Sequence, residues 1–313
     1  MKILLPSLAL AALTSAGFAQ QDQPSFRMQV NSRLISTTLT VRDAKGQLVT
    51  NLPQEAFHIQ EDGRDQSVRY YASQRELPLS IALIVDASGS QDKFVKEHEH
   101  EIEAFLKTVM EPRDRAFAVC FGNHLRLVTD WTNDPKQVTE SVHLFNKGDH
   151  SGSELGPQEQ RELGTALYDA VYFSVTEKME TEREHRRVLI VFSDGEENSS
   201  EHDLIDAITA AQGADTLVYA LRTTENKESK MTPRDRYGMR ALDHLTQATG
   251  GQSFDIRVIK PKDAFRSIAD DLKSLYEIGY YSNNSTRDKR FRKITITAGE
   301  GTTVRAREGY TPR

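Results

Sequence analysis

The sequence predicts a doubly wound α/β fold with a mostly parallel sheet, together with a small β-sandwich formed by the two flanks of that sheet. Continuous apolar runs at residues 80–85, 187–192 and 216–221 are typical of strands buried on both faces of a parallel sheet. Amphipathic helical patterns lie between these runs, and this alternation is characteristic of α/β folds. Strand-like segments precede and follow the α/β block, and they predict the sandwich.

The first residues predict a signal peptide at residues 1–19. Lys2 precedes an apolar stretch at 3–13, and small residues follow up to Ala19, which is the order of a secretory signal and its cleavage site. The stretch is interrupted by Pro6 and falls short of the roughly 20 residues that span a bilayer. We expect cleavage near Ala19, a mature chain starting near Gln20, no transmembrane segment, and a secreted or periplasmic protein.

The N-terminal flank, residues 26–76, has the alternation of short antiparallel strands. Residues 34–42 and 48–49 are separated by the turn-forming segment 43–46, which predicts a hairpin. A second strand-like piece at 57–60 meets a turn at 61–63, and residues 68–71 alternate again.

The α/β domain is predicted at residues 77–276. Two helices within it are indicated by apolar residues on one face. These are Phe94, His98, Ile102, Phe105 and Val109 in the first helix and Leu167, Val171, Val175 and Met179 in the second. We interpret His98 as a packing residue and Cys120, the only cysteine, as a buried filler of the core.

The chain returns to β structure at residues 277–313. A last helix begins at Pro261 and Asp263 and carries Ala264, Ile268, Leu272 and Leu275 on its apolar face. Strand-like segments follow at 276–281, 291–297 and 302–307, with a turn at 299–301. We expect these strands to pair with the N-terminal flank.

Three polar loops are predicted at one edge of the parallel sheet. Asp86, Ser88 and Ser90 follow the first buried strand, Thr165 stands at a helix start, and Asp194 follows another buried strand. Ligands bind at the carboxyl edge of strands in open α/β sheets. Carboxylate and hydroxyl oxygens suit Mg²⁺, Mn²⁺ or Ca²⁺, and no Cys or His cluster suggests zinc.

A purely structural interpretation is that the first of these loops caps a helix beginning near Gln91, because Asp and Ser are favoured there. It explains one loop but not the other two. Asp169 fits either support of the ligands or a charge at a helix start, and Glu196 and Glu197 fit either the rim of a cation site or the first turn of a following helix.

The motifs DASGS, GTALYDA and FSDG resemble the three parts of the metal-ion-dependent adhesion site of the von Willebrand factor type A family. The resemblance covers residues 79–276 and implies a Rossmann-like fold. It further implies that Ser88, Ser90 and Thr165 are hydroxyl ligands and that Asp86 and Asp194 are the carboxylates. The β flanks resemble those of exported type A domain proteins from acidobacteria.

The resemblance implies a metal-dependent binding module, in which an acidic residue of a partner protein completes the coordination of the cation. Loops at 147–163 and 222–237 are expected beside the site, where they would set partner specificity. A formal charge of −6 without a Lys/Arg block argues against nucleic acid. One alternative is an envelope or assembly component with a structural cation. The other is a metal-dependent hydrolase, which the absence of a Gly-x-Ser-x-Gly elbow disfavours, so we expect no enzyme.

Overall fold

The computed structural model describes eight segments of the chain. They are residues 34–73, 77–88, 92–122, 125–149, 151–156, 164–223, 231–286 and 288–312, and for 92–98 the backbone alone is described. The predicted signal peptide at 1–19, Ser90 and the side chain of His98 therefore lie outside the described residues.

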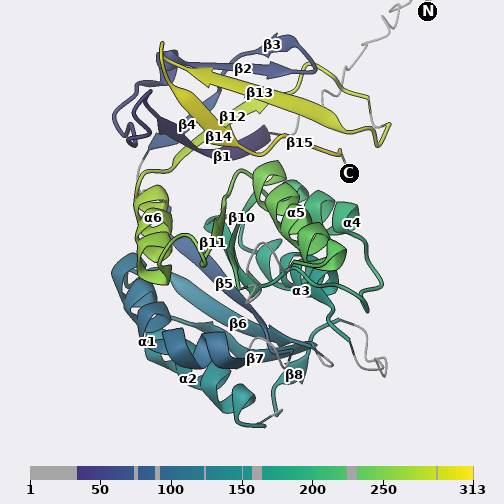
Figure 1. Ribbon diagram of the computed structural model, residues 1–313. Helices are drawn as coiled ribbons and strands as arrows, with labels where there is room; N and C mark the ends of the chain where they lie inside the picture. Colours follow the sequence, from purple (N-terminus) through teal and green to yellow (C-terminus); the bar gives the residue numbers. More distant parts are fainter. Residues whose placement is uncertain are drawn as a thin grey trace, which may run out of the picture. The chain divides into compact units, whose positions relative to one another are not determined.

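The α/β part is built on a seven-stranded sheet with the order β11-β10-β9-β5-β6-β7-β8 (Figure 1). Its parallel strands are β5 (Leu79–Asp86), β6 (Arg115–Phe121), β9 (Arg186–Ser193), β10 (Thr216–Arg222) and β11 (Ser253–Asp255). β7 (Leu125–Thr132) pairs antiparallel with β6, and β8 (Ser153–Glu154) pairs antiparallel with β7. The three apolar runs thus form β5, β9 and β10, which confirms the predicted mostly parallel sheet.

Helices cover both faces of this sheet. One face packs against α1 (Asp92–Val109), α2 (Pro135–Asn146) and α6 (Pro261–Lys273), and the other against α3 (Leu167–Phe173), α4 (Leu204–Gly213) and α5 (Pro233–Ala248). Successive residues of β5 alternate between the two cores, with Leu83 in the first and Ile84 in the second. Because both faces are covered, β5 is apolar from Ile81 to Val85, before it ends at Asp86.

The helix predicted from Leu167, Val171, Val175 and Met179 is α-helical only at its start. From Ser174–Met179 the backbone widens into a π-helix, and all four apolar side chains are buried. An α-helix advances about 3.6 residues per turn, so a spacing of four would carry Met179 away from the core side. The wider turn returns Met179 to the core, where it is fully buried.

The two flanks form two four-stranded antiparallel sheets. The first has the order β14-β1-β12-β4 and the second β15-β13-β2-β3. Strands of the first sheet are β1 (Leu34–Arg42), β4 (Tyr70–Ser73), β12 (Tyr276–Tyr281) and β14 (Thr303–Ala306). Those of the second are β2 (Phe57–Glu61), β3 (Arg64–Gln66), β13 (Arg292–Ala298) and β15 (Gly309–Tyr310), and a short 3₁₀ turn, Gln54–Ala56, precedes β2. Both sheets contribute to one core, so the predicted pairing of the flanks into a sandwich is confirmed.

The hairpin predicted after β1 is present but short. Leu48 bridges Arg42 and the Val49 N–H donates to the Val41 carbonyl at 2.9 Å, at the part of β1 where its pairing with β12 has already ended at Leu39. The strand expected at 68–71 begins at Tyr70 as β4 and pairs with β12 in the first sheet. The turn at residues 62–63 places Arg64 opposite Glu61, so β3, which no pattern predicted, is the hairpin partner of β2.

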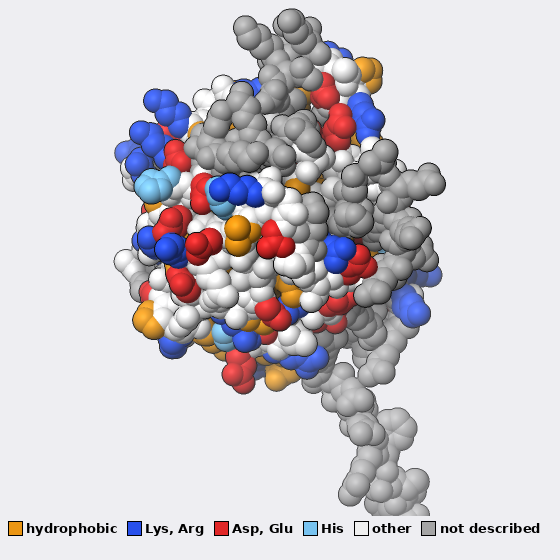
Figure 2. Space-filling view, turned by 90° about the horizontal axis from the view of Figure 1, so that it is seen from below, with side chains coloured by type: hydrophobic (Ala, Val, Ile, Leu, Met, Phe, Trp, Pro, Cys, Tyr) orange, Lys and Arg blue, Asp and Glu red, His pale blue; other side chains and the backbone are white. Residues whose placement is uncertain are grey.

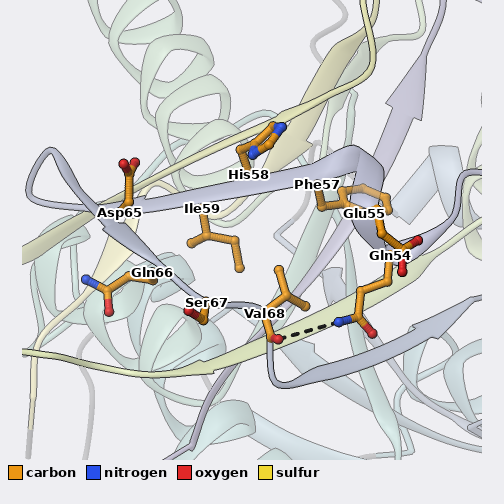
Figure 3. A pocket seen from close by; sticks show the side chains of 9 residues that line it. All are labelled: Gln54, Glu55, Phe57, His58, Ile59, Asp65, Gln66, Ser67 and Val68. Atoms are coloured by element: carbon orange, nitrogen blue, oxygen red, sulfur yellow. Dashed lines mark hydrogen bonds between the residues drawn. The ribbon is translucent and has the colours of Figure 1, made fainter.

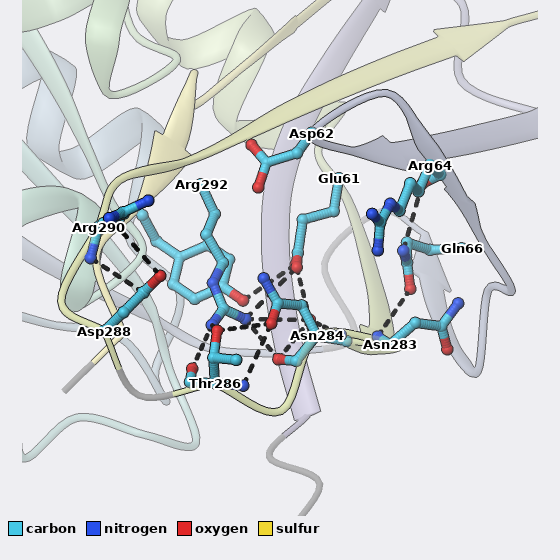
Figure 4. A network of polar contacts seen from close by, with 12 residues as sticks. Glu61, Asp62, Arg64, Gln66, Asn283, Asn284, Thr286, Asp288, Arg290 and Arg292 are labelled. Atoms are coloured by element: carbon cyan, nitrogen blue, oxygen red, sulfur yellow. Dashed lines mark hydrogen bonds and ion pairs between the residues drawn. The ribbon is translucent and has the colours of Figure 1, made fainter.

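A buried polar network lies where the chain passes from β12 to β13 (Figure 4). The Glu61 carboxylate accepts hydrogen bonds from the Tyr280 hydroxyl at 2.7 Å and the Tyr310 hydroxyl at 2.9 Å, and it pairs with the Arg292 guanidinium at 3.5 Å. Arg292 also donates to the carbonyl oxygen of Asn284 at 2.6 Å and to that of Thr286. The network therefore holds the β12–β13 loop against the sandwich.

Polar contacts also join the sandwich to the α/β part, and residues Ser32–Arg313 form one compact unit. The Thr38 hydroxyl of β1 donates to Asp215 at 3.1 Å, at the turn before β10. Arg42 of β1 and Arg305 of β14 both pair with Asp271 of α6, which is fully buried. The sandwich is therefore attached at the amino ends of the parallel strands and along α6. Among the described helices, none is long and apolar enough to cross a bilayer.

Candidate metal centre

Asp86 ends β5 with a buried carboxylate that is 1% exposed. Its Oδ1 accepts hydrogen bonds from the backbone N–H of Ser88 at 3.0 Å and from the Ser88 hydroxyl at 2.6 Å. Its Oδ2 accepts from the Ser193 hydroxyl at 2.7 Å. Because β5 pairs with β9 on one side and β6 on the other, Asp86 lies where the strand order reverses, the place where such sheets bind ligands.

Asp194 follows β9 directly, beside Asp86. Its Oδ1 accepts the backbone N–H of Glu196 at 2.8 Å, which fixes the turn through Gly195. Gly195 has φ +83°, and a Cβ there would lie 2.4 Å from the carbonyl oxygen of Gly238 in α5. The backbone of α5 therefore closes against the Asp194 turn, and no side chain fits between them.

Thr165 lies just before α3 and is 6% exposed. Its backbone N–H donates to Asn198 Oδ1 at 2.7 Å, and its carbonyl accepts the Asn198 N–H at 3.1 Å. Asn198 belongs to the loop that begins with Asp194. This two-point contact brings the loops of Thr165 and Asp194 together, as the sequence predicted for these two parts of the site.

The carboxylates of Asp86 and Asp194 carry like charges at this edge of the sheet. Burial raises the pKa of Asp86 to about 6, the hydrogen bonds from Ser88 and Ser193 lower it, and the neighbouring charge of Asp194 raises it further. Both the burial of the Asp86 carboxylate and the nearby charge of Asp194 therefore disfavour ionisation of Asp86. A cation between them would remove this penalty, because it supplies the missing countercharge.

The donor set fits a hard cation. Among the residues that the structure describes, no three His, Cys, Asp or Glu side chains form a group that could hold a metal ion. The predicted set contains only two carboxylates, and its other donors are hydroxyls, which suit Mg²⁺, Mn²⁺ or Ca²⁺. Of the five predicted ligands, Asp86, Ser88, Thr165 and Asp194 stand on the loops expected for them, and Ser90 lies outside the described residues.

The structure gives partners to the three acidic residues whose roles the sequence did not decide, Asp169, Glu196 and Glu197. Asp169 is fully buried and accepts the backbone N–H groups of Glu201 and His202, both at 3.0 Å. Glu197 accepts the N–H of Tyr168 at 3.1 Å, at the amino end of α3. Glu196 pairs with Arg234 at 3.5 Å, and the helix after these residues begins only at Leu204, so neither glutamate lies in its first turn.

Sequence reasoning missed two residues at the site. Ser193 holds the Asp86 carboxylate, and the hydroxyl in FSDG was a usable signal for it. Asn198 contacts Thr165, but it lies 33 positions away in the chain, and no local pattern links the two.

The two loops expected beside the site are formed in part by regular elements. Residues 153–154 form the edge strand β8, and α5 begins at Pro233 within the segment expected to be a loop. A capping box at Thr232 and Asp235 starts that helix, and this signal outweighs the polar composition of the segment. Residues 157–163 and 224–230 lie outside the described residues.

Figure 2 shows the molecule from below, from the side opposite the two four-stranded sheets. On the described part of this face, acidic and basic side chains are interspersed.

A cavity of about 350 Å³ lies in the sandwich, beside β2 and β3 (Figure 3). Phe57, Ile59 and Val68 give it an apolar part, and polar side chains in its lining, such as His58 and Asp65, are exposed. It is separate from the loops that carry Asp86, Thr165 and Asp194.

The mostly parallel sheet, with helices on both faces and polar loops at its carboxyl edge, defines a doubly wound α/β domain. Residues 80–234 match the family profile of the von Willebrand factor type A domain, and this part of the chain belongs to that family. Domains of this family commonly mediate protein–protein interaction. No curated protein sequence matches the chain significantly.

Several solved structures are similar to the chain. A von Willebrand factor type A protein from Catenulispora acidiphila is 12% identical, with 88% of this chain and 73% of that one covered and a TM-score of 0.44. An aerotolerance-related membrane protein from Bacteroides fragilis is 17% identical, with 62% and 98% covered and a TM-score of 0.42. The pilus adhesin SpaC from Lactobacillus rhamnosus GG is 10% identical, with 87% and 47% covered and a TM-score of 0.42.

Proposed function

We propose that this chain is an exported, metal-dependent protein-binding module without enzymatic activity. Asp86, Ser88, Ser90, Thr165 and Asp194 would hold one Mg²⁺, Mn²⁺ or Ca²⁺, directly or through water. The cation would supply an open coordination position that accepts a carboxylate of a partner protein, since Mg²⁺ keeps several exchangeable ligands when few protein groups bind it. The signal-like residues 1–19 support export to the periplasm or the exterior.

The observation that carries this proposal is the pair of carboxylates at the point where the strand order reverses. Asp86 is buried, and the adjacent Asp194 raises its pKa further. Without a ligand this arrangement is unfavourable, because the burial of Asp86 and its repulsion by Asp194 both oppose its ionisation. A bound cation would offset this cost, and the neighbouring hydroxyls would complete a set of oxygen ligands.

Among the described residues, Ser80 has the partners of a nucleophile, but its position does not support a hydrolase. The Ser80 hydroxyl donates to Glu182 at 2.7 Å and lies 2.9 Å from His185 Nδ1, a combination found in nucleophilic enzymes. However, Ser80 is fully buried at the start of β5, at the edge of the sheet opposite Asp86. A substrate cannot reach this hydroxyl, so we interpret the cluster as structural.

The test is calorimetric titration of Mg²⁺, Mn²⁺ and Ca²⁺ into the chain from Gln20 to Arg313. We expect one site in the wild type and no binding in Asp86→Asn or Thr165→Ala, with both variants folded by circular dichroism. Asp130→Asn is the matched control, because its side chain is 66% exposed and pairs with Lys178 instead. No saturable binding by the folded wild type would refute the metal site.

The role of the cation is tested separately. If it is structural, Asp86→Asn and chelator should both unfold the domain, whereas a recognition site should lose only its ligand. In the Mn²⁺-loaded protein, acetate or a short aspartate peptide should displace bound water and lower the water proton relaxation rate. No change at saturating carboxylate would contradict an open coordination position.

A further inference from the structure

The loop from Glu197 to His202 lies along the amino end of α3 and is joined to it by a series of hydrogen bonds. We refer to residues 197–202 as the docking loop. It follows Asp194 in the chain, while the segment it contacts begins at Thr165. Two candidate cation ligands are therefore connected through these hydrogen bonds, in addition to their connection through the sheet.

Asn198 makes the contact nearest to the candidate ligands. Its side-chain oxygen accepts the N–H of Thr165 at 2.7 Å, and its own N–H donates to the Thr165 carbonyl at 3.1 Å. Both polar groups of the Thr165 backbone are thus fixed by one residue. The direction of the Thr165 hydroxyl is set as a consequence, because a β-branched side chain has few rotamers once its backbone is fixed.

Glu197 and Asp169 hold the docking loop on either side of Asn198. Besides Tyr168, the Glu197 carboxylate accepts from the backbone N–H groups of Ser199 and Ser200, both at 2.8 Å, and from the Ser200 hydroxyl at 2.7 Å. The Asp169 carboxylate accepts the next two N–H groups, as described above, and His202 Nδ1 lies 2.7 Å from it. Because these hydrogen bonds engage both carboxylates, we interpret Glu197 and Asp169 as residues that position the docking loop and not as ligands at the rim of the cation site.

The fit between the two segments leaves no room at Gly164. A Cβ there would lie 2.5 Å from Asn198 Oδ1 and 2.6 Å from Ser199 Cβ. Glycine before Thr165 is therefore required by the close approach of the docking loop. The sequence carries this requirement as the first residue of GTALYDA.

We propose that Asn198 is a positioning residue for the cation site: through its two hydrogen bonds to Thr165 it holds the Thr165 hydroxyl at a fixed place relative to Asp194. This inference rests on the proposed function, because it assumes that Thr165 and Asp194 share one cation. Removing a residue that hydrogen-bonds to a metal ligand typically lowers the affinity for the metal, even where the fold persists.

The test compares three variants of the docking loop by Mn²⁺ titration, with unfolding temperatures measured in chelator. Asn198→Ala removes the oxygen that accepts the Thr165 N–H, and because the Asn198 side chain is exposed, the fold should tolerate this change. We expect the Mn²⁺ dissociation constant to rise about 10- to 100-fold. Asn198→Asp keeps an acceptor oxygen and should recover most of the affinity. Ser199→Ala is the matched control, because the structure shows no hydrogen-bond partner for the Ser199 hydroxyl among the described residues.

The outcomes separate the two proposals. If the wild type binds no Mn²⁺, the metal site itself is refuted, and the role of Asn198 with it. If the wild type binds and Asn198→Ala binds equally well, the site stands and the positioning role is wrong. If Asn198→Asp binds Mn²⁺ as weakly as Asn198→Ala, the acceptor oxygen does not position Thr165. If both variants lose Mn²⁺ affinity only in proportion to a lowered unfolding temperature, Asn198 supports the fold and does not position Thr165.

Discussion

Gly195 and Gly238 bring the Asp194 turn and helix α5 into backbone contact, and we expect substitution at Gly195 to be costly. Gly195→Ala adds a positive-φ penalty and places a Cβ 2.4 Å from the Gly238 carbonyl oxygen. Left-handed backbone and overpacking together predict a loss of about 2–5 kcal/mol in the free energy of unfolding. Urea denaturation measures this loss, and weaker cation binding should accompany it.

Gly63→Ala is the control for the steric part of this prediction. Gly63 has φ +76° in the β2–β3 turn, and a Cβ there would meet nothing within 4 Å. This variant should lose only the backbone contribution, about 1–2 kcal/mol. Equal losses in the two variants would show that the contact with Gly238 is unimportant.

At single residues, sequence reasoning succeeded where the chemistry was local. Asp86, Ser88 and Asp194 follow apolar strands directly, so residue type and position were enough to place them at one edge. Glu197 and Asp169 could not be assigned, because their partners are backbone N–H groups of another segment. Such partners leave no trace in the spacing of side chains.

Among the elements, β12 joins two environments and carries a group that should make stability depend on pH. Tyr276 and Ile278 face the sandwich core, whereas Glu277 points the other way. Burial and the nearby charge of Asp215 raise the pKa of Glu277 from 4.5 to about 7, although Arg186 and Arg187 lower it. The folded chain therefore holds this proton more tightly than the unfolded chain does.

The sign of the effect follows from this difference. Between pH 4.5 and about 7 the folded state binds more protons at Glu277, so this group lowers stability as pH rises through that range. Glu277→Gln should flatten this part of the stability profile and raise the unfolding temperature at pH 8, with little change near pH 4. A lower unfolding temperature at pH 8 would mean that attraction to the charges of Arg186 and Arg187 outweighs the burial of the Glu277 charge.

The elements that could be predicted are those with strong periodicity. β5, β9 and β10 are buried on both faces, and α6 has an apolar face throughout, so their patterns are continuous. The start of α5 is polar and the strand β7 is half-exposed, so neither has such a pattern, although the capping box at Thr232 and Asp235 is a local signal for the start of α5. The π-helical turn before Met179 was likewise not predictable, although the spacing of four is consistent with it.

For the whole molecule, the contacts of Asp271 indicate that the sandwich and the α/β part unfold together. The sandwich contains strands from both ends of the described chain, and two of its arginines, Arg42 and Arg305, pair with this one residue of α6. Asp271 is fully buried and also accepts the Tyr219 hydroxyl at 3.3 Å. Its charge is therefore balanced mainly by residues of the sandwich.

A double-mutant cycle on Arg42 and Arg305 tests this dependence. Each single change to alanine leaves Asp271 one arginine, so each should cost less than the roughly 3–5 kcal/mol expected when a buried charge loses its partner. The double variant should cost more than the sum of the two, by a coupling of about 0.5–3 kcal/mol, because only then is Asp271 unpaired. Adding Asp271→Asn should recover much of the loss, since it removes the buried charge. Additive losses without such recovery would mean that Asp271 does not couple the sandwich to the α/β part. The arginines would then act through separate contacts, such as the hydrogen bond from Arg305 to Gln252 at 2.6 Å.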